Sequence, residues 1–309
     1  GFTYYFGPNK YKLFKSYDKG KEESNKWDLD ELIPLGWGIF GWVNKILVIP
    51  VFNFLEKFID SYGIIILLLT LFIKLVLLPL TYKSYLSTAK MKVLRPQIEE
   101  INAKIPAEKA MERQKATMAL YKKVGVSPMG GCLPMMLQMP ILFALFTFFP
   151  ASIELRQESF LWAKDLSTFD AIVSWDTYIP IISTYYGNHI SLFCVLMAIT
   201  NIVYTKLNSD ATGSTQQMPG MKYVMYLMPL MFLVFFNEYA SGLSYYYFIS
   251  TLFTILQTYI FRLFIDDEKL LKKLNENKKK PSKKSRFAEK LEQLQKQQLE
   301  LQKQQRNKK

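Results

Sequence analysis

The 309-residue chain has little of the chemistry that enzymes and metalloproteins use. It contains one histidine, His189, and two cysteines, Cys132 and Cys194, which lie in or beside apolar runs. No second cysteine or histidine stands at ligand spacing, so the sequence indicates neither a disulfide framework nor a metal site. It has no HExxH motif, no glycine-rich phosphate loop and no paired carboxylates inside an apolar run. We therefore expect neither enzymatic catalysis nor a cofactor.

Hydrophobic and basic residues are both abundant. Half of the residues are hydrophobic, yet the net charge is +13, so apolar and basic segments must be separated along the chain. This pattern is typical of a membrane protein with basic aqueous parts. We expect an all-α membrane protein with five transmembrane helices, two of them short enough to favour a locally thinned bilayer. The five segments are 62–82, 132–149, 189–205, 223–237 and 242–265.

The charges of the connecting segments predict the orientation. Residues 83–131 carry 10 Lys and Arg against 4 Asp and Glu, whereas residues 150–188 carry 2 against 5. The tail from Arg262 carries 16 against 7, and the loop 206–222 has 2 against 1. By the positive-inside rule, the first loop, the loop 206–222 and the basic tail 266–309 are cytoplasmic. The N-terminal part and the loop 150–188 then face outward.

The segment 36–58 is nearly long enough to span a membrane, but polar residues and Pro50 interrupt it. Its tryptophans suit the headgroup level, so we interpret it as an amphipathic helix on the outer surface. A sixth span is the alternative, and residues 1–35 cannot decide between them because their charges balance. Residues 1–35 combine strand-like Tyr and Phe with a polar linker.

Lys74 is the most informative residue, because it lies inside the otherwise apolar run 63–80. A central lysine opposes insertion by about 3 kcal/mol, whereas the fourteen Ile, Leu, Val and Phe residues of the run each favour it by roughly 0.3 to 0.6 kcal/mol. The helix can therefore insert, but the charge needs solvation. The ammonium either snorkels to the interface or lies in a wet cavity or beside an acidic partner.

Uncharged polar residues are scattered over the other predicted spans. Each alone is typical of a hydrogen bond between helices, but together with Lys74 they would line a hydrated cavity. The expected set is Lys74, Thr70, Gln138, Asn201, Thr254 and Gln257.

The first loop and the tail are the basic aqueous parts. Residues 84–123 predict a helical hairpin, with an apolar face at Leu94, Ile98, Ile101 and Ile105 and a break at Pro106. Its basic excess suits anionic lipid, RNA or an acidic protein, although a merely solvated connector has the same composition. The tail is rich in Lys and Gln, which predicts disorder to about Lys284, followed by a short heptad pattern. Such a tail either binds phosphates of lipid or RNA or only keeps the chain soluble.

Residues 72–98, 127–146, 154–167 and 241–257 form four stretches whose order and spacing resemble the YidC/Oxa family of membrane protein insertases. The stretch SPMGGCLPMMLQMPILFALF, residues 127–146, is similar to the family signature at the start of its third transmembrane helix. The order and spacing also match at residues 72–98, at 154–167 and in SGLSYYYFISTLFTILQ, residues 241–257. FGPNKYKLF, residues 6–14, looks like the end of the large periplasmic β-domain of Gram-negative members. The resemblance implies a chain without the first helix and without most of that domain.

The resemblance implies a five-helix core whose hydrophilic groove opens to cytoplasm and lipid but not to the periplasm. Family members keep an arginine in this groove, and Lys74 takes its place here, with the charge but without the planar fork. In the family the hairpin is linked to partner contacts, which would place Lys90, Lys92, Arg95 and Arg113 at its contact surface.

The implied function is an insertase of the bacterial inner membrane that inserts nascent membrane proteins and helps them fold. The implied partners are a Sec translocon, a ribosome at the basic tail and anionic lipid. Two other functions stay open from the sequence. A transporter would use Lys74 as its coupling charge, although no internal repeat is found. A tethering protein would act through the tail and use its spans only as an anchor.

Overall fold

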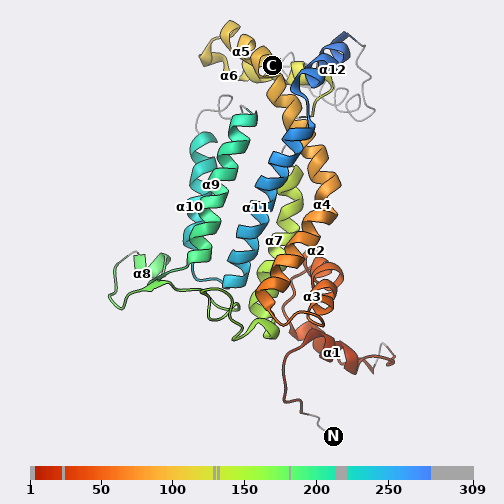
Figure 1. The fold of residues 1–309 in the computed structure, drawn as a ribbon, viewed down its shortest axis with the longest axis vertical. Coiled ribbons are helices and arrows are strands. Elements are labelled where there is room, and N and C mark those ends of the chain that lie inside the picture. The colour runs from red at the N-terminus through yellow and green to blue at the C-terminus, as the bar shows by residue number, and fades with distance from the viewer. Residues whose placement is uncertain are drawn as a thin grey trace, which may run out of the picture.

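The computed structural model describes residues 4–22, 25–127, 130, 133–180, 182–212 and 221–279. Cys132, residues 213–220 of the loop 206–222 and the heptad pattern of the tail lie outside these residues. Figure 1 shows an elongated bundle of helices with further elements at both ends. The bundle helices are α4 (Tyr62–Val93), α7 (Leu133–Ala151), α9 (Leu192–Thr212), α10 (Met221–Phe236) and α11 (Ser241–Phe264).

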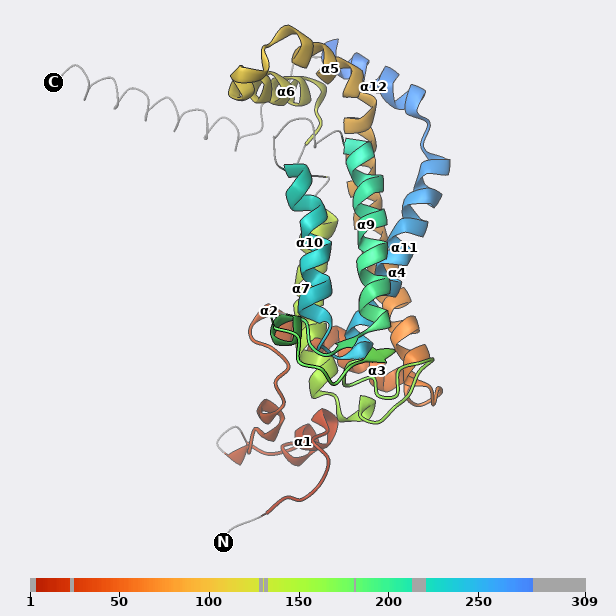
Figure 2. The same cartoon turned by 90° about the vertical axis from the view of Figure 1, so that its left-hand side faces the viewer.

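The two ends of the bundle carry different elements. We call one the hairpin end, where α5 (Arg95–Lys104), α6 (Ala110–Val124) and α12 (Asp267–Lys279) lie, and the other the loop end (Figures 1 and 2). The loop end carries a two-stranded antiparallel sheet with Val173 opposite Ile190 and Ser174 opposite His189. Its elements are α1 (Tyr11–Tyr17), α2 (Ile39–Val43), α3 (Ile49–Leu55), β1 (Val173–Ser174), α8 (Ile182–Tyr185) and β2 (His189–Ile190). Short helical turns lie at Leu29–Leu32, Asn44–Val48, Ala107–Lys109 and Ile153–Leu155.

Two of these helices, α4 and α11, are long and apolar enough to cross a membrane. The apolar stretches Ile39–Leu55, Met136–Ala151, Leu192–Asn208 and Tyr223–Phe236 are shorter. Helix α4 is longer than the segment 62–82 and also includes the first ten residues of the expected hairpin. Of the four residues in the predicted apolar face of the hairpin, Leu94 and Ile98 are buried, whereas Ile101 and Ile105 are partly exposed.

The main hydrophobic core lies in the loop-end half of the bundle. On α4 its members run from Ile65 to Ile73, and on α7 from Ile141 to Phe149. On α11 the core includes Leu243, Tyr245 and Tyr246 near the start of the helix. Helix α11 packs against both α9 and α4, and α10 packs along α9. The loop-end half is therefore densely packed.

The hairpin end has a separate, smaller core. Leu94 and Ile98 meet Tyr121 and Val124 of α6, and Leu270 and Leu274 of α12 complete the cluster. The expectation of disorder from Asp266 is therefore wrong for Asp267–Lys279, which form a helix. The two leucines are four residues apart on one helical face, and burying them against the hairpin stabilises the helix.

The N-terminal segment also differs from expectation. Its strand-like interpretation is wrong for the residues described, because Tyr11–Tyr17 form a helix and no residue among 4–22 and 25–35 is a strand. Phe14 is buried in the main core, and its ring packs edge-on against Tyr5. Tertiary packing of the aromatic residues thus decides the conformation, against their β propensity.

Candidate functional site

Lys74 lies between three helices. Its Nζ donates a hydrogen bond to Thr254 Oγ1 of α11 at 2.9 Å and to Gln138 Oε1 of α7 at 3.4 Å. Gln138 Nε2 in turn donates to the Tyr246 hydroxyl at 3.2 Å. Lys74 is only 6% exposed, and no described carboxylate forms an ion pair with it. An ammonium has three donors, so two neutral acceptors leave one donor and the whole charge uncompensated by the described residues.

The Lys74 cluster marks the point where dense packing stops. On α4, Lys74 is followed by nine residues, 75–83, none of which is buried, and the next buried residue is Ser84. On α11, Thr251 is the last buried residue, so Thr254 lies just beyond the packed part. Gln138 likewise precedes Ile141, the first core member on α7. The three hydrogen-bonded residues thus form a polar layer at the boundary of the core.

Two prolines leave backbone carbonyl oxygens without helical donors near the same layer. Pro79 lies inside α4 and Pro140 lies inside α7. Proline has no N–H, so the carbonyls of Leu75 and Met136, four residues earlier, lose their helical donors. Leu75 follows Lys74 directly, and Met136 is two residues from Gln138. In a bilayer such carbonyls are tolerated where protein or water can satisfy them.

The other expected site residues do not join the hydrogen-bonded cluster. Thr70 is fully buried, but its hydroxyl donates to the Ile66 carbonyl at 2.7 Å. Asn201 donates to the Met197 carbonyl of its own helix at 2.9 Å. Gln257 is half-buried and makes no side-chain hydrogen bond within the described part of the chain. It lies about one turn beyond Thr254 on α11.

Tyr246 is the member of the cluster that our sequence reasoning missed. It is completely buried and accepts the Gln138 hydrogen bond. A tyrosine in an apolar run is usually read as a core residue. Its spacing in the sequence could have identified it, because Tyr246, Ser250 and Thr254 recur every four residues on α11 and form a polar stripe.

The basic residues expected at the hairpin contact surface mostly have partners within the chain. Lys92 forms an ion pair with Asp267 at 2.9 Å, and Arg95 forms one with Glu99 at 3.1 Å. Arg113 donates to the carbonyls of Asn102 and Ile105, both at 2.8 Å. Arg113 therefore joins α6 to the end of α5. Lys90 is half-buried.

Buried polar side chains tie the loop 150–188 to the bundle at the loop end. Asp170 is 2% exposed and accepts hydrogen bonds from Trp162 Nε1, Ser191 Oγ and the Phe193 backbone N–H, at 2.5 to 3.0 Å. Asn237 follows α10, accepts a bond from the Ser191 N–H and donates to the carbonyls of Tyr186 and His189. The His189 ring stacks on Phe169, at 3.8 Å between ring centroids. These bonds fix the loop 150–188 to α9 and α10.

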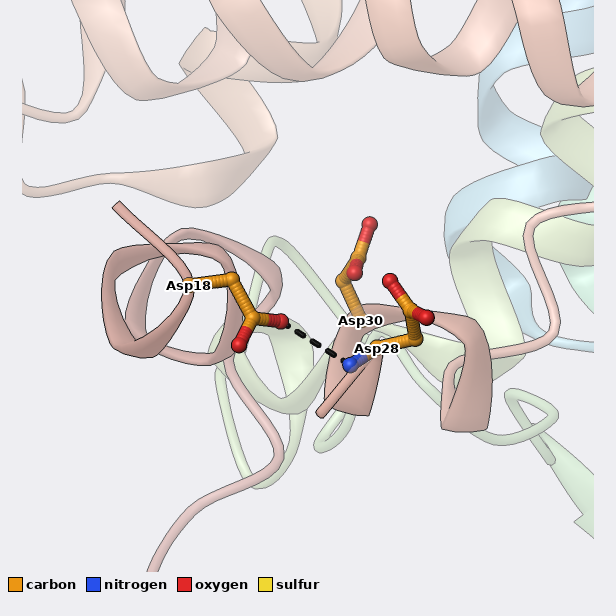
Figure 3. Close-up of side chains that lie close together, drawn as sticks. All are labelled: Asp18, Asp28 and Asp30. Carbon is orange, nitrogen blue, oxygen red and sulfur yellow. Dashed lines mark hydrogen bonds between the residues drawn. The ribbon is translucent and has the colours of Figure 1, made fainter. Parts of the chain in front are cut away.

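Three aspartates come together beside α1, as Figure 3 shows. The Asp18 carboxylate already accepts the backbone N–H groups of Trp27 at 2.8 Å and Asp28 at 2.9 Å. These bonds, led by that from Trp27, lower the pKa of Asp18. Lys21 is paired with the same carboxylate at 3.4 Å. The cluster therefore closes a loop in the N-terminal segment, and its geometry does not require an ion.

Two helices long and apolar enough to cross a membrane, with a buried cation among them, are features of an integral membrane protein. The comparisons with known proteins identify its family. A family model described as "60Kd inner membrane protein" matches residues 54–269. The chain belongs to this family, and the similar proteins described next carry the name YidC.

The membrane protein insertase YidC of Parabacteroides distasonis is 66% identical over 310 residues, which are 99% of this chain and 49% of that protein. The YidC of Porphyromonas gingivalis strain ATCC 33277 is 50% identical over 313 residues, covering 100% of this chain and 50% of that protein. A crystal structure of an active YidC insertase with its first transmembrane domain resolved is 28% identical, with a TM-score of 0.51. That match covers 82% of this chain and 54% of the solved chain. The chain thus spans about half the length of the curated relatives it matches.

Proposed function

We propose that the chain is the membrane-embedded core of an insertase that moves hydrophobic protein segments into the lipid bilayer. Its relatives carry that name. The observation that carries the proposal for this chain is the position of Lys74. Its charge lies at the edge of the packed core and has only neutral partners among the described residues.

In the proposed mechanism, Lys74 attracts the acidic, hydrophilic end of an incoming chain. The unburied stretches of α4 and α11 beyond the cluster would border a hydrophilic groove, open toward the hairpin end. A substrate carboxylate would take the remaining Lys74 donor in a charge-assisted hydrogen bond, which is stronger than a neutral one. Water held by the same polar groups would solvate the tail before it crosses.

The apolar part of the substrate would leave along α7 and α10. Several large apolar side chains on these helices are exposed, which suits contact with lipid or with a guest helix. Flexible methionines among them accept varied apolar partners. The exposed side chains include Met136, Met139, Phe143, Leu227, Met228 and Met231. Five spans and a cytoplasmic hairpin end are part of this proposal, in which the bonds of Asp170 and Asn237 keep the periplasmic side closed.

Reconstitution tests the proposal directly. The full chain is placed in liposomes with a single-span substrate that has an acidic outer tail, and insertion is measured by protease protection. We expect Lys74→Gln and Lys74→Ala to reduce insertion about tenfold or more, since a hydrogen bond to a charged group contributes roughly 1.5 to 3 kcal/mol. Lys74→Arg keeps the charge and retains most of the activity.

The control is Lys164→Gln, an exposed lysine in the loop 150–188 and outside the proposed groove, which leaves insertion unchanged. We expect insertion of a substrate with a neutral tail to be equal in the parent and in the Lys74 variants. Equal insertion of the acidic-tailed substrate by all variants would exclude the charged-groove mechanism.

A further inference from the structure

The face of the α2 and α3 segment turned away from the bundle is apolar. Its exposed residues Ile39, Trp42, Ile46, Pro50 and Phe54 recur every three or four residues, so they share one side of the segment. The large side chains Ile39, Trp42, Ile46 and Phe54 are each more than half exposed, as is Phe58 just after α3. Such a face is unfavourable in water and is expected to lie in the headgroup and acyl boundary of a bilayer.

A narrow apolar groove runs between α3 and α4 beside this face. It has a volume of about 290 Å³ and is lined by Pro50, Val51, Phe54, Leu55, Leu68 and Phe72. The lining contains no charged or polar side chain. Leu68 and Phe72 lie one and a half to three turns into α4, so the groove follows that helix toward the bilayer centre.

A basic cavity adjoins the groove on its outer side. The cavity measures about 920 Å³ and shares Pro50 and Phe54 with the groove. Six lysines line it against three aspartates, and one of these, Asp18, is already bound by backbone N–H groups. Lys45 and Lys57 are exposed, and neither forms an ion pair within the described part of the chain. The basic cavity and the apolar groove therefore adjoin at Pro50 and Phe54.

We propose that the basic cavity and the groove together bind one anionic glycerophospholipid. Lys45 and Lys57 contact the phosphate and headgroup, and one acyl chain occupies the groove between α3 and α4. The charge complementarity and the continuity of the groove with exposed apolar residues of α4 favour a lipid. A bound lipid would fix α3, and with it the N-terminal segment, to α4. The inference rests on the proposed placement of α2 and α3 at the membrane surface.

Native mass spectrometry of the full chain in an uncharged detergent tests the site. The protein is titrated with phosphatidylglycerol and with phosphatidylcholine of the same acyl length. We expect the first phosphatidylglycerol to bind more tightly than phosphatidylcholine. The double variant Lys45→Gln/Lys57→Gln should lose about thirtyfold in affinity for phosphatidylglycerol, or about fivefold per lysine at a membrane surface. Its affinity for phosphatidylcholine should fall much less, because the choline cation already offsets the charge of that phosphate.

The matched control is Lys104→Gln/Lys115→Gln, which removes the same charge from exposed positions on the hairpin. It should keep the lipid preference. A second arm tests the groove: Leu68→Trp fills it with an apolar side chain and should weaken both lipids equally. Glycerol 3-phosphate in excess should not displace the lipid, because it has no acyl chain.

Three results would overturn the site: no preference for phosphatidylglycerol in the parent, equal losses in the two double variants, or displacement by glycerol 3-phosphate. Insertion assays on Lys45→Gln/Lys57→Gln separate this site from the insertase proposal. A chain that prefers phosphatidylglycerol but inserts independently of Lys74 would remove the proposed function and leave the lipid site. A chain that shows no preference for phosphatidylglycerol but whose insertion depends on Lys74 would exclude only the lipid site.

Discussion

Lys74 illustrates how a charge is accommodated where the helix around it is apolar. Its two partners, Thr254 and Gln138, come from different helices and offer one oxygen each. A compact ammonium with freely placed donors suits two separate acceptors, whereas the planar fork of an arginine suits paired acceptors on one group. Lysine at this position therefore matches the neighbours that α7 and α11 present.

Asp170 is the buried carboxylate for which we make a stability prediction. Replacing Asp170 with Asn turns one acceptor oxygen into a donor that faces other donors, so a buried hydrogen bond is lost. We expect a loss of roughly 1 to 3 kcal/mol in stability, measured as a lower Tm in detergent. Asp176→Asn in the same loop changes an exposed residue and should leave Tm unchanged. If the two variants unfold at the same temperature, Asp170 does not hold the loop.

At the scale of elements, hydropathy predicts the bundle helices because a long apolar run has few alternatives to a helix. The Lys74 cluster was partly predictable for the same reason, since a polar residue in such a run stands out. Tyr246 was not predicted as a site residue, because tyrosine is common in hydrophobic cores. Leu270 and Leu274 were missed because they lie in a lysine-rich stretch and their partners are more than a hundred residues away. The sequence alone does not show such long-range packing.

Helix α12 provides the second stability prediction. Leu274 is 2% exposed and packs in the hairpin-end core. Leu274→Ala removes buried methyl groups, a change that destabilises by roughly 2 to 5 kcal/mol in other proteins, here concentrated in one short helix. We expect faster amide hydrogen exchange throughout α12, measured by mass spectrometry, with little change in α11.

The matched control for α12 is Lys273→Ala, which alters the neighbouring exposed residue. Its exchange in α12 should equal that of the parent. Unchanged exchange in Leu274→Ala would show that the ion pair between Lys92 and Asp267, and not apolar packing, retains the helix.

The whole molecule is asymmetric along its long axis. The main core and the polar bonds of the loop 150–188 lie toward the loop end, whereas α4 and α11 have no buried residues over 75–83 and 252–264. The helix pair is therefore rigid at one end and sparsely packed beyond Lys74. This difference favours access to the Lys74 cluster from the hairpin end, which is also the end with the basic loop and tail.

Chemical labelling of single cysteines tests the proposed membrane orientation of the whole molecule. In a background with Cys132→Ser and Cys194→Ala, one exposed residue at a time is changed to cysteine. An impermeant maleimide is then applied to intact and to permeabilised spheroplasts. The positions are Lys19, Lys104, Asp176 and Glu276, all exposed.

We expect Asp176→Cys to label in intact spheroplasts, and Lys104→Cys and Glu276→Cys to label only after permeabilisation. This result follows if an odd number of spans separates the hairpin end from the loop end. Lys19→Cys decides the remaining alternative: labelling together with Asp176→Cys supports α2 and α3 on the outer surface, whereas labelling together with Lys104→Cys requires a sixth span. Labelling of Asp176→Cys and Lys104→Cys from the same side would contradict the orientation on which the closed periplasmic side depends.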